Sequence, residues 1–295
     1  MTHTLVIKEV SRPDGVKIRY GIWRGQQKPT QAILFLNGRT EWIEKYDFIP
    51  GLLNLKDSTS FISIDHRGQG ASGGRRAHID SYDDFAADTQ AIVAESIGKD
   101  MPYALLTHSM GGLIGLYALT TGRIAPTTGV LCSPLLGLPE DPIPAMIAKP
   151  LSRILSFTPL TNLSSGAGQM DKTPFTSNRL THSKEMFDKI THSPYPLRGV
   201  TFGWVNATFS AMQKIHSPEA LKTIAIPLLV LAGSDERVVD TAAFSPWIQQ
   251  ANQCAKARID FISIYGGRHE LLSETPEFRD QAISQIKQRL SAFTQ

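Results

Sequence analysis

Short apolar runs alternate with helical patterns along most of this chain. Continuous apolar stretches of strand length lie at residues 32–36, 60–64, 103–108, 129–133, 227–232 and 258–264. Apolar residues at helical spacing follow at residues 43–55, 82–97, 113–119, 243–251 and 277–293. Strands buried on both faces have continuous apolar runs, and alternating strands and helices build parallel sheets. The pattern therefore predicts an α/β fold whose mostly parallel central sheet is covered by helices on both faces.

Two regions depart from this alternation. Residues 5–11 and 16–23 have extended patterns, and Asp14-Gly15 between them is a turn signal, so we predict a hairpin. From Pro134 to about Ile215, prolines and amphipathic apolar positions replace the alternation. We interpret residues 134–215 as a helical cap inserted into a single core formed by residues 1–133 and 216–295.

The composition is that of an ordinary globular enzyme. The chain has 295 residues, of which 41% are hydrophobic and 19% charged, with a net charge of +3. That charge is too small to indicate nucleic-acid binding. The two cysteines, Cys132 and Cys254, form neither a disulfide framework nor a zinc site. Since the chain has no signal-peptide core and no apolar run of membrane-spanning length, we expect a cytoplasmic protein, with peripheral contact to the inner membrane through the cap.

The most informative stretch is the strand that ends at Ser109. The small residues Gly111 and Gly112 follow this serine, and a helical pattern then begins. A serine placed between a strand and a helix lies at the tip of a tight turn, whose backbone strain costs about 1–3 kcal/mol. This context predicts that Ser109 is a nucleophile that attacks acyl carbons.

A serine hydroxyl needs a base, and that base needs a carboxylate to orient it. Asp235 and His269 each follow a predicted parallel strand, and ligands of such sheets bind beyond the carboxyl ends of the strands. The order serine, acid, histidine is the order of α/β-hydrolases. We therefore predict a triad of Ser109, Asp235 and His269, with Glu236 and Asp240 as alternatives for the acid.

The oxyanion formed by attack on the acyl carbon needs two hydrogen-bond donors. We expect the backbone N–H of Met110, directly after the nucleophile, and that of Arg39, in the loop after the first parallel strand. His108, directly before Ser109, is expected to point away from the hydroxyl, and His66 is expected to be structural.

With these residues in place, the chain resembles the branch of the α/β-hydrolase superfamily that holds monoacylglycerol lipases and bacterial lysophospholipases. The resemblance covers nearly the whole chain and is weakest in the cap. The matching segments are residues 37–46 (NGRTEWIEKY), 65–73 (DHRGQGASG), 108–112 (HSMGG), 233–239 (GSDERVV) and 267–271 (GRHEL). The resemblance implies a Ser–His–Asp triad without a cofactor or metal, and hydrolysis of single-chain acyl esters under a lid.

The chain departs from this family pattern at two positions. Thr107 stands where the family usually has glycine two residues before the nucleophile, and it should crowd the helix that follows. Asn37 stands where the family has histidine before the oxyanion loop. Neither departure removes a catalytic atom.

We expect a serine esterase that acts on lysophospholipids or monoacylglycerols, with Phe187, Trp204 and Phe209 of the cap lining the acyl pocket. Packing within the cap is the other interpretation of these three side chains. An aminopeptidase or amide hydrolase on the same fold is an alternative, and it would need a cap carboxylate such as Glu185 or Asp188 to hold an amine. A non-catalytic, ligand-binding relative is a further alternative. Haloalkane dehalogenase and epoxide hydrolase chemistry are disfavoured because both need an aspartate at the position of Ser109.

Overall fold

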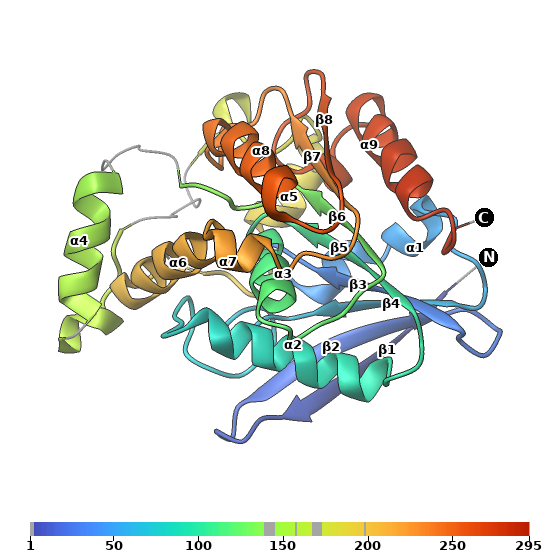
Figure 1. The fold of residues 1–295 in the computed structure, drawn as a ribbon, viewed down its shortest axis with the longest axis horizontal. Coiled ribbons are helices and arrows are strands. Elements are labelled where there is room, and N and C mark those ends of the chain that lie inside the picture. The colour runs from blue at the N-terminus through green and yellow to red at the C-terminus, as the bar shows by residue number, and fades with distance from the viewer. Residues whose placement is uncertain (1–2, 139–144, 157, 167–172, 198, 295) are drawn as a thin grey trace.

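One twisted sheet runs through the protein (Figure 1). The computed structural model describes residues 3–138, 145–156, 158–166, 173–197 and 199–294. Within this part of the chain, eight strands are ordered β1-β2-β4-β3-β5-β6-β7-β8. Their bounds are β1 (Thr4–Ser11), β2 (Lys17–Arg24), β3 (Gln31–Leu36), β4 (Thr59–Ile64), β5 (Tyr103–His108), β6 (Thr128–Cys132), β7 (Leu228–Gly233) and β8 (Ile259–Ile264).

The sheet combines an antiparallel edge with a parallel centre. β1 and β2 form the predicted hairpin, with Gly15 at a φ of 80° in the turn, and β2 continues antiparallel to β4. Every other neighbouring pair is parallel. The predicted α/β fold with a mostly parallel sheet is therefore confirmed.

The two faces of the sheet carry separate apolar cores because side chains alternate along a strand. In β3, Leu34 and Leu36 point to the face covered by α2 (Tyr82–Ser96), α3 (Met110–Thr120) and α8 (Phe244–Cys254). Ile33 and Phe35 point to the face covered by α1 (Ile49–Leu52) and α9 (Pro276–Arg289). Both faces are buried, which explains the continuous apolar runs of the central strands.

The helix predicted over residues 43–55 is wrong in extent. The segment forms a 3₁₀ turn, η1 (Ile43–Tyr46), followed by the single turn α1. Proline removes a backbone donor and disfavours a helical conformation in the residue before it, so Pro50 allows a helix to begin but not to run through. The other helices of the core begin and end within a few residues of the predicted positions.

The segment between β6 and β7 contains the helices predicted as a cap. They are α4 (Ala145–Ser156), α5 (Lys184–Thr191) and α6 (Phe202–Ile215), with the 3₁₀ turns η2 (Pro159–Asn162) and η3 (Phe175–Ser177). The short α7 (Pro218–Leu221) follows, within the segment predicted as core. α6 packs on α3 of the core, and α4 packs on the outer side of α6, far from the sheet (Figure 1). Residues 139–144 and 167–172 of the predicted cap lie outside the described residues. Among the described helices, none has the length and apolarity to cross a bilayer.

Candidate active site

Ser109 stands in a strained turn between β5 and α3. Its φ is 52° and its ψ −119°, a left-handed conformation that residues with a side chain rarely adopt. The turn is closed by hydrogen bonds from the Ser109 amide to the carbonyl of Cys132, at 3.0 Å, and from the Gly112 amide to the carbonyl of Ser109, at 2.9 Å. The expected strain at this serine is confirmed, and the turn presents the side chain at the carboxyl edge of the sheet.

Glycine is required directly after this turn because α3 begins against the backbone of β3. A Cβ atom at Gly111 would overlap the carbonyl oxygen of Leu36 and lie 2.5 Å from that of Asn37. Both obstacles are main-chain atoms, which cannot rotate away. The glycine that follows this turn in the sequence is therefore required because no side chain fits at position 111.

Thr107 fits because glycines of α3 face it. A Cβ atom at Gly115 would lie 3.1 Å from Cγ2 of Thr107, and a Cβ atom at Gly112 would lie 3.4 Å from Oγ1 of Thr107. Thr107 is completely buried. The crowding expected from this departure is thus relieved on the helix side.

We expect Gly111→Ala to destabilise the protein by more than about 3 kcal/mol, because backbone atoms of two residues must shift to admit the methyl group. Gly51→Ala is the matched control, since a Cβ atom at Gly51 meets nothing within 4 Å. This control should be neutral or stabilising by up to about 1 kcal/mol, because alanine is the better helix former. Urea denaturation curves of both variants measure the difference, and equal stabilities would contradict the close approach.

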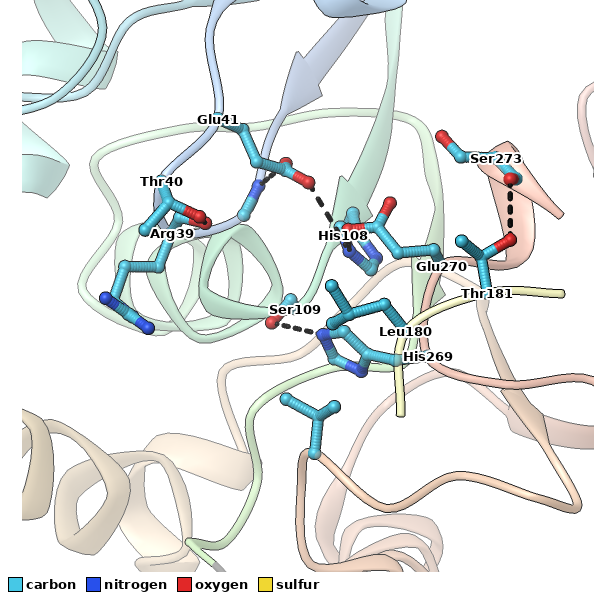
Figure 2. Close-up of polar contacts among 12 residues, drawn as sticks. Arg39, Thr40, Glu41, His108, Ser109, Leu180, Thr181, His269, Glu270 and Ser273 are labelled. Carbon is cyan, nitrogen blue, oxygen red and sulfur yellow. Dashed lines mark hydrogen bonds and ion pairs between the residues drawn. The ribbon is translucent and has the colours of Figure 1, made fainter. Parts of the chain in front are cut away.

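His269 lies in hydrogen-bond contact with the serine. Its Nε2 atom is 2.9 Å from Oγ of Ser109, although the two residues are far apart in the sequence (Figure 2). His269 follows β8 and is only 4% exposed. The structure therefore brings Ser109 and His269 together as predicted.

The carboxylate that orients His269 belongs to Glu236, not to Asp235. Oε2 of Glu236 is 2.8 Å from Nδ1 of His269. Asp235 instead binds two arginines, with Oδ1 2.5 Å from Arg237 and Oδ2 3.4 Å from Arg268. The predicted place of Asp235 in the triad is thus wrong, and the alternative Glu236 occupies it. Asp240, the other alternative, caps the turn η4 (Thr241–Ala243) by accepting from the amide of Ala242.

The loop after β7 explains why the acid is one residue later than predicted. Asp235 is half-exposed, whereas the carboxylate of Glu236 is buried and its Oε1 accepts the amides of Val238, at 2.7 Å, and Val239, at 3.3 Å. Burial raises the pKa of Glu236, but the imidazole of His269 and the Val238 amide outweigh burial, so the net pKa is lowered. Glu236 is therefore ionised at neutral pH. It accepts the Nδ1 proton of His269, which leaves the Nε2 lone pair facing the serine hydroxyl.

The loop that carries Arg39 is fixed on both sides of that residue. The Gly38 amide donates to Oε2 of Glu41, and the Thr40 amide donates to Oε1 of Gln69 at 2.8 Å. Met110 is the first residue of α3, so its amide has no partner within the helix. Figure 2 shows the loop that carries Arg39 and the first turn of α3 beside the Ser109 hydroxyl. This is the place where an oxyanion would form.

The histidines near the site differ in role. His66 is buried, and burial lowers its pKa to about 4, so it is neutral and its Nε2 lies 3.2 Å from the carbonyl of Asn37. His108 turns away from the serine hydroxyl toward Glu41 and Glu270, as expected.

The three aromatic residues expected to line an acyl pocket belong to two apolar clusters. Phe187 of α5 packs with Leu180 and Ile190. Trp204 of α6 belongs to the large core cluster that also contains Met110, and Phe209 packs against that cluster. Trp204 and Met110 thus belong to the same apolar cluster, but the structure does not bring Phe187, Trp204 and Phe209 together in one group.

Part of the segment between β6 and β7 lies against the loop that carries His269. The Glu270 amide donates to the carbonyl of Leu180 at 2.9 Å. The Thr181 hydroxyl lies 3.0 Å from the carbonyl of Ser273 (Figure 2). The buried carboxylate of Glu274 accepts the amides of Arg268, at 3.0 Å, and His182, at 2.8 Å, and also binds the Thr181 hydroxyl and the His182 ring. Residues 180–182 are thereby attached to the loop that carries His269.

The fold and this geometry place the chain among the serine hydrolases with the α/β-hydrolase fold. More narrowly, it belongs to the family described as Serine aminopeptidase, S33, which matches residues 27–276.

Relatives of known name extend over almost the full chain. Human monoglyceride lipase is 30% identical over 291 residues, which cover 95% of this chain and 89% of the relative. Lysophospholipase L2 of Escherichia coli is 25% identical over 94% of this chain and 85% of the relative. Among solved structures, a soluble variant of monoglyceride lipase from Saccharomyces cerevisiae, in complex with a substrate analog, superposes with a TM-score of 0.76 at 21% identity, covering 100% of this chain and 96% of that chain.

Proposed function

We propose that this protein is a serine esterase that hydrolyses single-chain acyl lipids, of the lysophospholipid or monoacylglycerol type, through an acyl-enzyme. The observation that carries the proposal is the continuous contact from Ser109 through His269 to Glu236, at 2.9 and 2.8 Å. Relatives that are named monoglyceride lipase and lysophospholipase support this substrate class.

In the proposed acylation step, Nε2 of His269 takes the hydroxyl proton of Ser109 while Oγ attacks the ester carbonyl carbon. The amides of Met110 and Arg39 hold the oxyanion, and each such donor contributes about 10²–10³ in rate. When the intermediate collapses, the ester C–O bond breaks and His269 gives its proton to the leaving alcohol, while Glu236 stabilises the imidazolium. Water then repeats the sequence on the acyl-enzyme, which releases a fatty acid and restores Ser109.

The cap, for which we retain the proposed extent of residues 134–215, supplies the acyl-binding surface. We assign Trp204 and Phe209 to one side of the acyl-binding surface, because their helix α6 packs on α3, which begins at Met110. Phe187 is assigned to the opposite side, because its cluster includes Val238, two residues after Glu236.

The ester preference is supported by the surroundings of the cap carboxylates. An amide hydrolase of the aminopeptidase type would need such a carboxylate to bind a free amine. Asp188 is paired with Lys184 on the surface of α5, at 2.5 Å, and Glu185 is exposed.

Activity-based labelling and a substrate panel test the proposal. A fluorophosphonate probe should label the wild-type protein at Ser109, identified by peptide mass spectrometry. The protein should then cleave p-nitrophenyl acyl esters and lysophospholipids or monoacylglycerols much faster than aminoacyl amides. Absence of labelling would exclude the serine mechanism, and faster cleavage of the amides would exclude the esterase assignment.

We further propose that the cap touches the membrane surface from the cytoplasmic side. Four large apolar side chains of α4 and the turn after it are exposed, namely Leu151 (42%), Ile154 (66%), Leu160 (44%) and Leu163 (54%). The free cysteines Cys132 and Cys254 are consistent with a reducing compartment.

Replacing Ile154 and Leu163 together by aspartate should weaken binding to phosphatidylcholine vesicles at least tenfold, because each apolar side chain that enters a lipid phase contributes about 1.5–3 kcal/mol. Hydrolysis of a soluble short-chain ester should not change. Val6→Asp is the control, because Val6 is similarly exposed, at 40%, but lies on β1 at the far edge of the sheet. Vesicle co-sedimentation measures the effect, and equal binding by both variants would exclude this surface.

A further inference from the structure

A fully buried ionic cluster lies behind the catalytic residues. The ammonium of Lys45 is 2.5 Å from Oε1 of Glu41 and 2.8 Å from Oε2 of Glu270, and the Lys45 side chain is 0% exposed. Nε2 of His108 lies 3.5 Å from Oε1 of Glu270 and 3.7 Å from Oε1 of Glu41. The hydroxyl of Tyr46 donates to Oε2 of Glu41 at 2.6 Å.

Lys45 and Glu270 remain charged despite burial. Burial lowers the pKa of Lys45, but the two facing carboxylates more than offset it, so the pKa is raised. Burial raises the pKa of Glu270, yet Lys45 and His108 hold it well below its usual value. Taking ions out of water costs several kcal/mol per ion, and apolar residues of similar volume often give equal stability. Stability alone therefore does not explain a lysine at this position.

The position of the cluster indicates what it does. Three members are each next to a different element of the proposed active site: Glu41 accepts the Gly38 amide in the loop that carries Arg39, His108 directly precedes Ser109, and Glu270 directly follows His269. The rings of His108 and His269 are also in contact, with centroids 4.8 Å apart. Figure 2 shows Glu41, His108 and Glu270 close together at the end of β5. Lys45 binds both carboxylates and thus connects the loop after β3 to the loop after β8.

A metal ion is not needed to make this connection. The ligand atoms of Glu41, His108 and Glu270 lie close enough together to hold one. Lys45 already places a cation within hydrogen-bond distance of both carboxylates. The chain therefore supplies its own positive charge.

We propose that Glu41, Lys45, His108 and Glu270 form a positioning cluster that fixes the oxyanion loop and the His269 loop at one distance from each other. The inference rests on the proposed serine mechanism and adds these four residues to it. None of them touches the reacting atoms. They act through the neighbours that do, since an error of about 1 Å in the placement of catalytic groups costs up to roughly 10²-fold in rate.

Glu270→Gln is the first test, because glutamine keeps the shape of the side chain and removes its charge. We expect kcat for a p-nitrophenyl ester to fall by about 10- to 100-fold while KM changes less than threefold, because catalytic geometry is lost and substrate binding is not. A kcat within twofold of the wild type would overturn the proposal.

Asp88→Asn is the matched control for general destabilisation. Asp88 of α2 is a buried carboxylate that binds Arg12 and Arg67, at 2.8–2.9 Å, and none of the three belongs to the site. This variant should lower the melting temperature as Glu270→Gln does, but its kcat should remain within twofold of the wild type. If both variants lose kcat in proportion to their melting temperatures, the cluster is structural only.

A charge-balanced variant keeps the test decisive if Glu270→Gln does not fold. Lys45→Met combined with Glu270→Gln removes one charge of each sign, and such replacements are often neutral or stabilising. We expect this double variant to recover the melting temperature but not kcat. Recovery of both would overturn the positioning role.

A readout independent of turnover is the proton NMR signal of the Nδ1–H group of His269, which binds Glu236. This signal should move or broaden in Glu270→Gln and remain unchanged in Asp88→Asn. A wild-type protein that is not labelled by fluorophosphonate would refute the proposed function itself. A wild type that is labelled, with Glu270→Gln labelled at the same rate, would refute only the positioning cluster.

Discussion

Ser109→Ala is expected to hydrolyse p-nitrophenyl esters on the order of 10⁶-fold more slowly than the wild type, because in triads the loss of the nucleophile costs nearly as much as the loss of all three residues. The residual rate comes from substrate binding and the oxyanion donors. The variant should also fail to react with fluorophosphonate.

The fold should survive this substitution, so the loss is catalytic. The cost of the left-handed conformation at position 109, where φ is 52°, applies to alanine as it does to serine. The melting temperature should therefore stay close to that of the wild type. Hydrolysis within tenfold of the wild type by a folded Ser109→Ala protein would exclude Ser109 as the nucleophile.

Glu236→Gln should lower kcat by about 10⁴-fold, the size of effect that an amide in place of the triad carboxylate produces when it stabilises the wrong histidine tautomer. The amide nitrogen would donate toward Nδ1, so Nδ1 would accept and the proton would sit on Nε2. In that state His269 cannot take the proton of Ser109.

Asp235→Asn is the matched control, since it makes the same chemical change one residue earlier. Asp235 is paired with Arg237 and Arg268 and its side chain is 30% exposed, and such pairs contribute about 0–1 kcal/mol. We expect a kcat within threefold of the wild type. If kcat, measured under the same conditions, fell more in Asp235→Asn than in Glu236→Gln, Asp235 would be the acid that orients His269.

Local sequence patterns predicted most of this fold. Continuous apolar runs identified the central strands, because those strands are buried on both faces, and the Asp14-Gly15 turn identified the hairpin. The helix around Pro50 was overextended because apolar spacing continued through a residue that the helix interior excludes.

Site residues that a local sequence feature marks could be predicted. Site residues whose role depends on contacts between distant segments could not. Ser109 was marked by its turn. Asp235 and Glu236 are adjacent and carry the same charge, so neither the residue type nor the position along the chain shows which of them is the acid that orients His269. Only the path of the loop after β7 decides which one is buried against His269. The sequence showed only that two carboxylates, Asp235 and Glu236, precede Arg237, and either of them could have been assigned as the acid.

The ionic cluster could not be anticipated for a related reason. In the sequence Lys45 stands between Glu44 and Tyr46, and its partner Glu270 is 225 positions away. No periodicity connects them, because the sheet alone brings their loops together.

The attachment of residues 180–182 to Glu274 has a practical consequence for engineering chimeric enzymes. If the whole segment between β6 and β7 were exchanged for that of another hydrolase, the buried carboxylate of Glu274 would face different hydrogen-bond donors. The loop that carries His269 would then lose its attachment to this segment. A transplant that ends before Asn178 keeps those bonds native. A recombination boundary on the amino-terminal side of this junction allows helix α4 to be exchanged while these hydrogen bonds are kept.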